Sequence, residues 1–230
     1  MQANKKIYIL IPAFNEGGKI GSVLAELKNA GYENIFVVND GSKDDTEKIA
    51  REAGAEVLNH IMNLGQGAAL RTGLEYINEK YSPDIIVTFD ADGQHRIEDI
   101  AKIIEPIIKE DFDIVLGSRF LKNKTKMPVL RKIILKAGII FTNLLSNIKL
   151  TDTHNGLRAL NKKAIDSIEI THRKMEHASD IIDEITKKKL RYKEVPVEII
   201  YSEYSIGKGT NKNMDFIKIG IKMIIKEITE

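Results

Sequence analysis

The chain has no cysteine among its 230 residues. This absence excludes disulfide bonds, thiolate nucleophiles, iron–sulfur clusters and cysteine-based zinc sites together. Any metal ion would have to be bound by oxygen or imidazole ligands, which favours Mg²⁺ or Mn²⁺ over a structural Zn²⁺.

Long apolar runs and an excess of one charge are missing as well. No uninterrupted apolar stretch approaches the ~20 residues that a membrane-spanning helix needs. The polar start of the chain leads directly into a strand-like run, so we expect no signal peptide. The sequence therefore predicts a cytoplasmic protein, at most peripheral to the inner face of a membrane. The 35 Lys and Arg residues nearly balance the 33 Asp and Glu residues, whereas a nucleic-acid-binding protein usually has a strongly basic face. We therefore expect no nucleic acid as a partner.

What is present is the composition of one globular domain, with 43% hydrophobic residues. In the first half, short β-branched runs alternate with amphipathic stretches, as is typical of an α/β protein with a mainly parallel sheet flanked by helices. The expected strands are 7–11, 35–38, 85–89 and 114–116, with a further short strand at 55–58, and the expected helices are 19–30, 44–53, 67–79 and 97–109.

The second half is less regular. It predicts a basic apolar helix at 127–150, a turn-rich segment at 151–155, a strand at 157–160, a helix at 178–189, an edge strand at 192–201 and an amphipathic helix at 215–228. The last helix carries Lys218, Lys222 and Lys226 at four-residue spacing on one face. The two basic helices could lie on an anionic membrane surface, although most such helices pack their apolar faces on their own domain.

Polar side chains follow three of the expected strands. Asn15 and Glu16 follow the first strand, Asp40 follows the second, and Asp90 and Asp92 follow the strand at 85–89. Ligands of open α/β sheets gather at the carboxyl ends of the strands. The pattern therefore predicts a ligand site at this edge of the sheet.

The sequence Asp90-Ala91-Asp92-Gly93-Gln94 suggests a metal site. Strand side chains alternate, so two carboxylates two residues apart can point the same way, and Gly93 lets the backbone turn. Asp92 and the amide oxygen of Gln94 would be hard oxygen ligands whose metal leaves positions open for a diphosphate. A helix cap and a solvated turn would explain the same residues.

Two other loops have a functional and a structural interpretation. Asp40, in Asn39-Asp40-Gly41-Ser42, could accept hydrogen bonds from a nucleobase or ribose, or the motif could be a turn and a helix N-cap. The glycine-containing loop at 63–69 could bring backbone amides to a phosphate or sugar, or could simply turn the chain. Each motif alone fits both a functional and a structural interpretation, but the order and spacing of the motifs together are specific.

The ordered motifs IPAFNE, VVNDGSKDDT, NLGQGAALRTG, FDADGQH and GSRF resemble glycosyltransferase family 2. Within it, the chain is most similar to the soluble catalytic domains of the polyprenol-phosphate sugar synthases, the dolichol-phosphate mannose synthase-like group. The resemblance covers nearly the whole chain and implies one GT-A-like domain over 1–230, with a nucleotide-sugar-binding half at 1–120 and an acceptor-side half at 121–230. It implies inverting transfer of a hexose from a GDP- or UDP-linked sugar, with Mg²⁺ or Mn²⁺ as cofactor.

The resemblance also implies roles for individual residues. The nucleotide- and substrate-binding residues are Pro12, Ala13, Asn15, Glu16, Asp40, Asn63, Gly65, Asp90 and Lys208; the metal ligands are Asp90, Asp92 and Gln94; and the catalytic residues are Asp92, Arg119, Arg158, Glu176 and Asp180. The segment 152–158 resembles the family's D-x-x-S-G-F-R stretch beside donor and acceptor, with Asn155 and Leu157 in place of the usual Ser and Phe.

The expected acceptor is polyprenyl phosphate, whose ionised phosphate needs no general base. The alternative acceptor is a saccharide hydroxyl in glycan synthesis, which would need a base such as Glu176 or Asp180; helix capping would explain these two residues equally well. Two rival functions are a sugar nucleotidyltransferase and a non-catalytic nucleotide-sugar-binding module. The first normally has a glycine-rich basic loop after its first strand, where this chain has Phe14-Asn15-Glu16.

Overall fold

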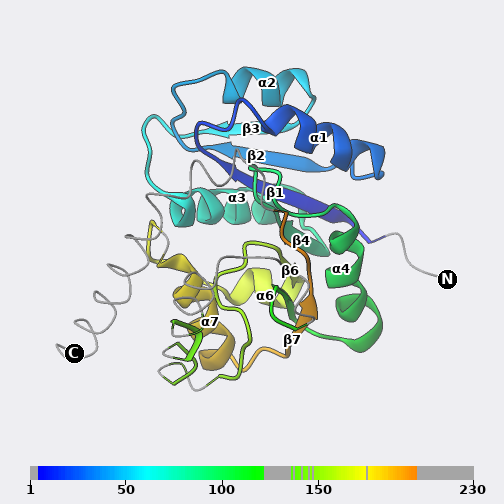
Figure 1. Cartoon of the computed structure of the whole chain (residues 1–230), viewed down its shortest axis with the longest axis vertical. Coiled ribbons are helices and arrows are strands. Elements are labelled where there is room, and N and C mark those ends of the chain that lie inside the picture. The colour runs from blue at the N-terminus through cyan, green and yellow to red at the C-terminus, as the bar shows by residue number, and fades with distance from the viewer. Residues whose placement is uncertain are drawn as a thin grey trace.

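The computed structural model describes residues 5–121, 136, 138–140, 142–144, 146, 148–174 and 176–200. They form a seven-stranded sheet in the order β3-β2-β1-β4-β6-β5-β7 with helices against it (Figure 1). The strands are β1 Ile7–Ala13, β2 Ile35–Asn39, β3 Glu56–Asn59, β4 Ile85–Thr88, β5 Ile114–Ser118, β6 Arg158–Asn161 and β7 Tyr192–Pro196. The helices are α1 Ile20–Asn29, α2 Thr46–Glu52, α3 Gln66–Tyr81, α4 Glu98–Glu110, α6 Lys162–Ser167 and α7 His177–Lys187.

One strand reverses the direction of an otherwise parallel sheet. β1 pairs in parallel with β2 and β4, β2 with β3, and β5 with β7. β6 runs antiparallel to both of its neighbours, β4 and β5. The predicted α/β class with a mainly parallel, mixed sheet is therefore confirmed.

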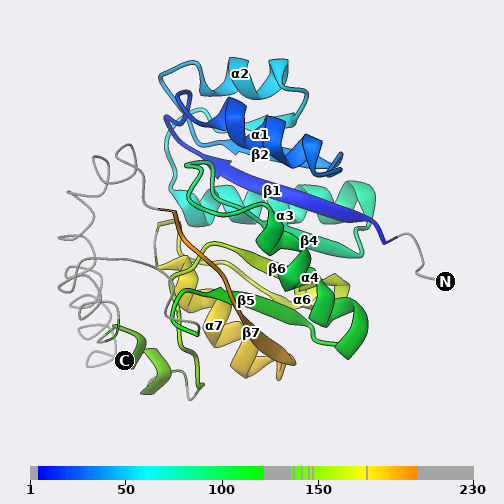
Figure 2. The same ribbon diagram turned by 45° about the vertical axis from the view of Figure 1, so that its right-hand side comes forward.

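Alternating side chains of the strands form a hydrophobic core on each face of the sheet. In β1, Ile9 and Ile11 pack in the core that contains α1, α2 and α4, whereas Tyr8 and Leu10 pack in the core that contains α3, α6 and α7. Figure 2 shows the sheet between these helices. Because both faces are covered, the central strands are apolar almost throughout, which is the pattern that made them recognisable.

Two elements differ from the sequence-based expectation. Helix α6 was not expected, since six residues are too few to show a helical period; it begins where the Asn161 side chain accepts the Ala164 N–H at 2.9 Å. The strand expected at 192–201 ends at Pro196, and beyond it Ile199 makes an isolated antiparallel bridge with His95. The predicted edge position of this strand is confirmed.

Part of the predicted second half lies outside the described residues. This applies to most of the helix at 127–150, to all of the helix at 215–228 and to Lys208. In the part of the chain that the structure describes, no helix has both the length and the apolar character needed to cross a bilayer.

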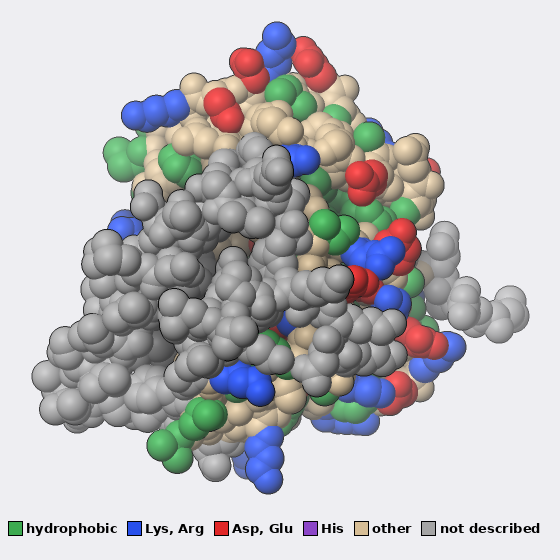
Figure 3. All heavy atoms as spheres, viewed as in Figure 1, with side chains coloured by type: hydrophobic (Ala, Val, Ile, Leu, Met, Phe, Trp, Pro, Cys, Tyr) green, Lys and Arg blue, Asp and Glu red, His purple; other side chains and the backbone are tan. Residues whose placement is uncertain are grey.

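Acidic and basic side chains alternate over the described part of the face in Figure 3. Ion pairs connect α4 and its flanks to β7 and the residues after it, such as Lys193 with Glu110 at 2.6 Å and Arg96 with Glu198 at 2.8 Å. Exposed pairs of this kind each stabilise a fold by only about 0–1 kcal/mol. The fold therefore depends mainly on its two apolar cores.

Candidate active site

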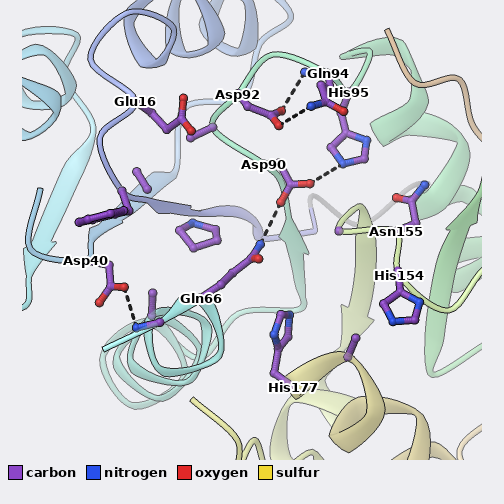
Figure 4. Close-up of a pocket in the computed structure, with 18 of the residues that line it drawn as sticks. Glu16, Asp40, Gln66, Asp90, Asp92, Gln94, His95, His154, Asn155 and His177 are labelled. Atoms are coloured by element: carbon purple, nitrogen blue, oxygen red, sulfur yellow. Dashed lines mark hydrogen bonds and ion pairs between the residues drawn. The ribbon is translucent and has the colours of Figure 1, made fainter. Parts of the chain in front are cut away.

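A pocket of about 680 Å³ opens where β1, β2, β4 and β5 end and the reversed strand β6 begins. Because parallel strands end at the same edge of a sheet, loops that are distant in sequence meet there (Figure 4). The predicted site residues that line the pocket are Pro12, Ala13, Asn15, Glu16, Asp40, Asn63, Gly65, Asp90, Asp92, Gln94, Arg119 and Arg158.

The loop after β1 is fastened to the loop after β2. Asn15 has a φ of 54°, in the left-handed region that Asn tolerates better than most residues. Its N–H donates to Oγ of Ser42 at 2.9 Å, and its Oδ1 accepts the Lys43 N–H at 2.8 Å. The Glu16 N–H donates to Oγ1 of Thr46 at 2.8 Å. Asn15 therefore shapes this wall of the pocket through both its backbone and its amide group.

Asp40 is only 3% exposed and is held by three donors. Its Oδ1 lies 2.7 Å from Nδ1 of His60 and accepts the Leu64 N–H at 2.9 Å, while its Oδ2 accepts the Gly65 N–H at 2.8 Å. His60 in turn contacts Oγ1 of Thr72 through Nε2 at 3.0 Å. His60 lies outside the ordered motifs, yet this side chain fixes the orientation of Asp40.

Asp90 lies at the centre of the pocket, next to Gln66, His95 and the backbone of Gly156 (Figure 4). Its Oδ1 accepts a hydrogen bond from Nε2 of Gln66 at 3.2 Å, and its Oδ2 lies 2.9 Å from Nε2 of His95. Gly156 passes so close that a methyl group on it would lie 2.4 Å from Oδ2 of Asp90. Position 156 therefore has to be glycine for this carboxylate to keep its place.

Asp92 and Gln94 are in direct contact. Asp92 accepts the Gln94 N–H at 3.0 Å and its side-chain Nε2 at 2.8 Å. Within the described ranges, no group of three or more His, Asp or Glu side chains could hold a metal ion by itself. The oxygen donors of Asp90, Asp92 and Gln94 nevertheless suit Mg²⁺ or Mn²⁺, provided that a bound ligand supplies further oxygens.

Arg119, which lines the pocket, forms a buried ion pair with Asp152. The Asp152 carboxylate accepts Nε of Arg119 at 2.6 Å, Nη2 at 2.7 Å and the Arg119 N–H at 3.0 Å. Burial alone would raise the pKa of Asp152, but the charge and hydrogen bonds of Arg119 outweigh it and hold that pKa below its ordinary value. Glu194 accepts the N–H groups of Thr151 and Asp152 at 2.8 Å and 3.0 Å, so this loop is fixed to β7.

Arg158 is 4% exposed and donates no side-chain hydrogen bond within the described chain. Burial lowers its pKa to about 10, partly offset by the charges of Asp90 and Asp152, so it stays protonated at neutral pH. Burial, together with the charge of Arg158, also lowers the pKa values of His154 and His177 to about 4. Both histidines are therefore neutral at pH 7.

Two buried polar atoms of the pocket wall have no hydrogen-bond partner among the described residues, namely Nδ1 of His95 and Nδ2 of Asn155. The Asn155 amide is oriented by the Leu157 N–H, which donates to Oδ1 at 2.9 Å. Asn155 therefore replaces the family's usual Ser with a side chain that is fixed and partly unsatisfied.

The structure does not bring Glu176 and Asp180 to the pocket wall, although both were predicted as catalytic. Glu176 directly precedes α7. Asp180, one turn into α7, accepts the N–H groups of Thr171 and His172 at 2.8 Å and 2.7 Å. Its carboxylate therefore holds a loop, which is closer to the structural interpretation that the sequence left open. Lys208 lies outside the described residues.

The pocket also has lining residues that were not predicted individually as site residues. They are Phe14, Gln66, Ala69, Ala91, His95, His154, Asn155, Gly156, Lys174, His177, Ala178 and Ile199. Many of them fall within or beside the recognised motifs, so a list of all polar motif residues would have included Gln66 and His95. Lys174 and His177 had no such signal.

Comparison with known proteins settles the family. The model of Glycosyl transferase family 2 matches residues 8–169. The chain belongs to glycosyltransferase family 2. An uncharacterized protein of Methanocaldococcus jannaschii is 42% identical over 227 residues, covering 97% of this chain and 93% of that protein. UDP-N-acetylglucosamine–dolichyl-phosphate N-acetylglucosaminyltransferase of Methanococcus voltae is 38% identical over 245 residues, covering 97% of this chain and 95% of the relative.

The chain has the same fold as a glycosyltransferase of known structure. Glucosyl-3-phosphoglycerate synthase of Mycobacterium tuberculosis, in complex with UDP, matches with a TM-score of 0.70 and 18% identity, covering 88% of this chain and 73% of that one. The GT-A-like fold and the family resemblance read from the sequence are therefore both confirmed.

Proposed function

We propose that this glycosyltransferase transfers N-acetylglucosamine from its UDP-linked form to the phosphate of a dolichyl-type polyprenyl phosphate. The Methanococcus voltae relative has this donor and this acceptor in its name, and the match extends over almost the full length of both chains. Structures of the Mycobacterium tuberculosis enzyme contain UDP with Mn²⁺ or with Mg²⁺, which supports a UDP-linked donor and a divalent cofactor.

The geometry that supports this reaction is the pairing of metal-binding oxygens with buried guanidinium groups in one pocket. Asp90, Asp92 and Gln94 would hold Mg²⁺ or Mn²⁺, which supplies positive charge for the leaving diphosphate. Arg119 and Arg158 lie in the same pocket and add positive charge where the sugar–phosphate bond breaks. Asp152 keeps the Arg119 guanidinium in one orientation, so this part of the pocket need not reorganise during transfer.

The choice between a phosphate and a hydroxyl acceptor depends on whether the site has a suitable general base. A hydroxyl acceptor needs a proton acceptor whose pKa lies near the working pH. His154 and His177 line the pocket with pKa values of about 4, and the Asp180 carboxylate is engaged with the loop before α7. An ionised phosphate attacks without losing a proton, so polyprenyl phosphate suits this site better than a saccharide hydroxyl.

The acceptor would be collected from a membrane surface. The helical residues Lys136, Ile140 and Leu144 are exposed at four-residue spacing, and the two apolar side chains are 69% and 79% exposed. Helical residues four apart lie on the same face. A face with one cation and two exposed aliphatic side chains suits shallow contact with an anionic bilayer, which supports a peripheral protein at the cytoplasmic side.

Product formation tests the proposal directly. The purified protein is incubated with dolichyl phosphate in detergent and UDP-N-acetylglucosamine, UDP-glucose or GDP-mannose, each with Mn²⁺, Mg²⁺ or EDTA, and lipid-linked sugar is measured by mass spectrometry. We expect product with UDP-N-acetylglucosamine and metal, and none with EDTA or in the Asp92→Asn variant. Dolichol, which lacks the phosphate, is the matched control acceptor. Transfer to dolichol at a comparable rate, or product from GDP-mannose alone, would contradict the proposal.

A further inference from the structure

Residues 171–174 form a short segment, named the wall here because its last residue, Lys174, lines the pocket, and this segment is anchored along its length. At its start, the Asp180 carboxylate accepts the Thr171 N–H at 2.8 Å and the His172 N–H at 2.7 Å, and it lies 2.5 Å from Nδ1 of His172. Asp180 is itself only 8% exposed, so these contacts are shielded from water. One buried carboxylate thus holds the first two residues of the wall.

The other end of the wall is held through carbonyl groups. The Arg173 carbonyl accepts the Ala68 N–H of α3 at 3.1 Å. The Lys174 carbonyl accepts the His177 N–H at 3.2 Å and lies 2.7 Å from Nδ1 of the same histidine. The backbone of Lys174 is therefore fixed between α3 and α7.

Two glycines of α3 and its N-cap let the wall lie directly against this helix. A methyl group on Gly67 would lie 2.1 Å from the His172 carbonyl oxygen, and one on Gly65 would lie 2.4 Å from that of Arg173. The same added methyl on Gly65 would be 3.0 Å from Cγ of Lys174, so the aliphatic part of this lysine crosses over Gly65. Gly65 also donates its N–H to Asp40, which places the lysine stem beside the Asp40 end of the pocket.

Lys174 differs from the other cations of the pocket. Arg119 is paired with Asp152, and Arg158 is under the influence of Asp90 and Asp152. Lys174 also lines the pocket, but no described Asp or Glu comes within ion-pair distance of its ammonium group. Lys174 is exposed, its backbone is fixed, and its head group has no counter-ion in the described chain, so it is suited to bind an anionic ligand that enters the pocket.

We infer that Lys174 binds an oxygen of a phosphoryl group in this pocket, and that Asp180 is the positioning residue that holds the wall presenting it. The inference rests on the proposed function in one respect, because that function brings two sources of phosphoryl groups to the pocket. They are the diphosphate of the donor and the phosphate of the acceptor. This assignment gives Asp180 a role other than that of a general base, since its carboxylate is already occupied by the wall.

Binding measurements separate this inference from the transfer reaction. Calorimetric titration of the full-length protein with UDP and Mg²⁺, and with geranyl phosphate, gives affinities for the two phosphate sources without any turnover. Uridine and geraniol are the matched ligands without phosphate. Arg173→Gln is the control variant, because Arg173 is exposed, adjacent in sequence and absent from the pocket lining.

We expect Lys174→Gln to weaken UDP or geranyl phosphate roughly 10-fold, the effect of losing one charge-assisted hydrogen bond. Whichever ligand is weakened identifies the source of the phosphoryl group. Lys174→Arg should restore most of the affinity, and Arg173→Gln should change it little. Unchanged affinity of Lys174→Gln for both phosphate ligands would overturn the inference, as would an equal loss in Arg173→Gln.

The role of Asp180 is tested by Asp180→Asn and by Gly67→Ala, which disturb the wall from opposite sides. Both should weaken the same phosphate ligand as Lys174→Gln, and the pH profile of transfer should keep its shape in Asp180→Asn. If Asp180→Asn instead abolishes turnover while binding both phosphate ligands normally, Asp180 acts as a base and the positioning role is wrong. Failure of the transfer reaction itself would leave these binding results unaffected.

Discussion

The buried pair between Arg119 and Asp152 allows a sharp test of how the active-site loops are stabilised. The Asp152→Asn variant keeps the size of the side chain but removes its charge, and places an amide N–H₂ where a carboxylate oxygen accepts from the guanidinium. Three hydrogen bonds of 2.6, 2.7 and 3.0 Å depend on this carboxylate. With 9% and 1% of the two side chains exposed, little water can replace them.

The expected loss in the free energy of unfolding is large because one charge of a buried pair would be left without its partner. Breaking such a pair destabilises a protein by about 3–5 kcal/mol. At roughly 2–4 °C per kcal/mol for a domain of this size, the melting temperature should fall by about 6–20 °C. Because the folded pKa of Asp152 lies below its ordinary value, the contribution is complete above the unfolded pKa and is lost as the pH falls through the folded pKa.

Thermal and urea unfolding at pH 7 measure the effect, with Arg119→Met and the double variant completing a double-mutant cycle. Asp166→Asn is the matched control, since Asp166 pairs with Lys162 at 2.7 Å with both side chains 48% exposed. The control should lose no more than about 1 kcal/mol. A loss of the same size for Asp152→Asn would refute the argument that burial makes this pair indispensable.

Three further predictions concern the residues around the pocket. His60→Phe should weaken UDP roughly 10-fold by releasing Asp40, with partial rescue in His60→Asn, measured by titration; equal affinities in both variants would contradict the positioning role. Gly156→Ala should reduce transfer by roughly 10²-fold with a cooperative unfolding transition retained, because its methyl group displaces Asp90; near-normal turnover would show that the carboxylate position is unimportant. His154 has a folded pKa of about 4, below its ordinary value, so the unfolded chain takes up the proton first. Stability should therefore fall as the pH drops from about 6.5 towards 4, by roughly 3 kcal/mol at most for this residue, and His154→Phe should reduce that slope in urea unfolding.

The parts of the fold that could be predicted are those determined by neighbouring residues. β-Branched runs such as 85–88 can be recognised because a strand covered on both faces is buried at every position and therefore mostly apolar. The turn that contains Asp92 and Gln94 was also predictable, since Gly93 lets the backbone reverse there. The metal role of these residues remains a prediction.

The parts that could not be predicted depend on contacts between distant segments. Arg119 and Asp152 are 33 residues apart, and nothing in either local sequence shows that they meet. The role of His60 could not be predicted because its two partners, Asp40 and Thr72, come from different segments of the chain. Asp180 shows the converse problem, because position in a family pattern suggested a base while the folded chain uses its carboxylate to hold a loop.

The bridge between His95 and Ile199 allows the turn at 90–94 to be followed from a segment outside it. The Ile200 N–H donates to the Gln94 carbonyl at 2.9 Å, and the Glu198 N–H donates to Oδ2 of Asp99 at 3.0 Å. The Ile200 amide exchanges with solvent when the segment at 198–200 separates from the turn, and the Glu198 amide when this segment separates from α4. Their deuterium uptake is therefore a built-in readout of how firmly the turn is closed, and it can be followed without placing any label in the active site.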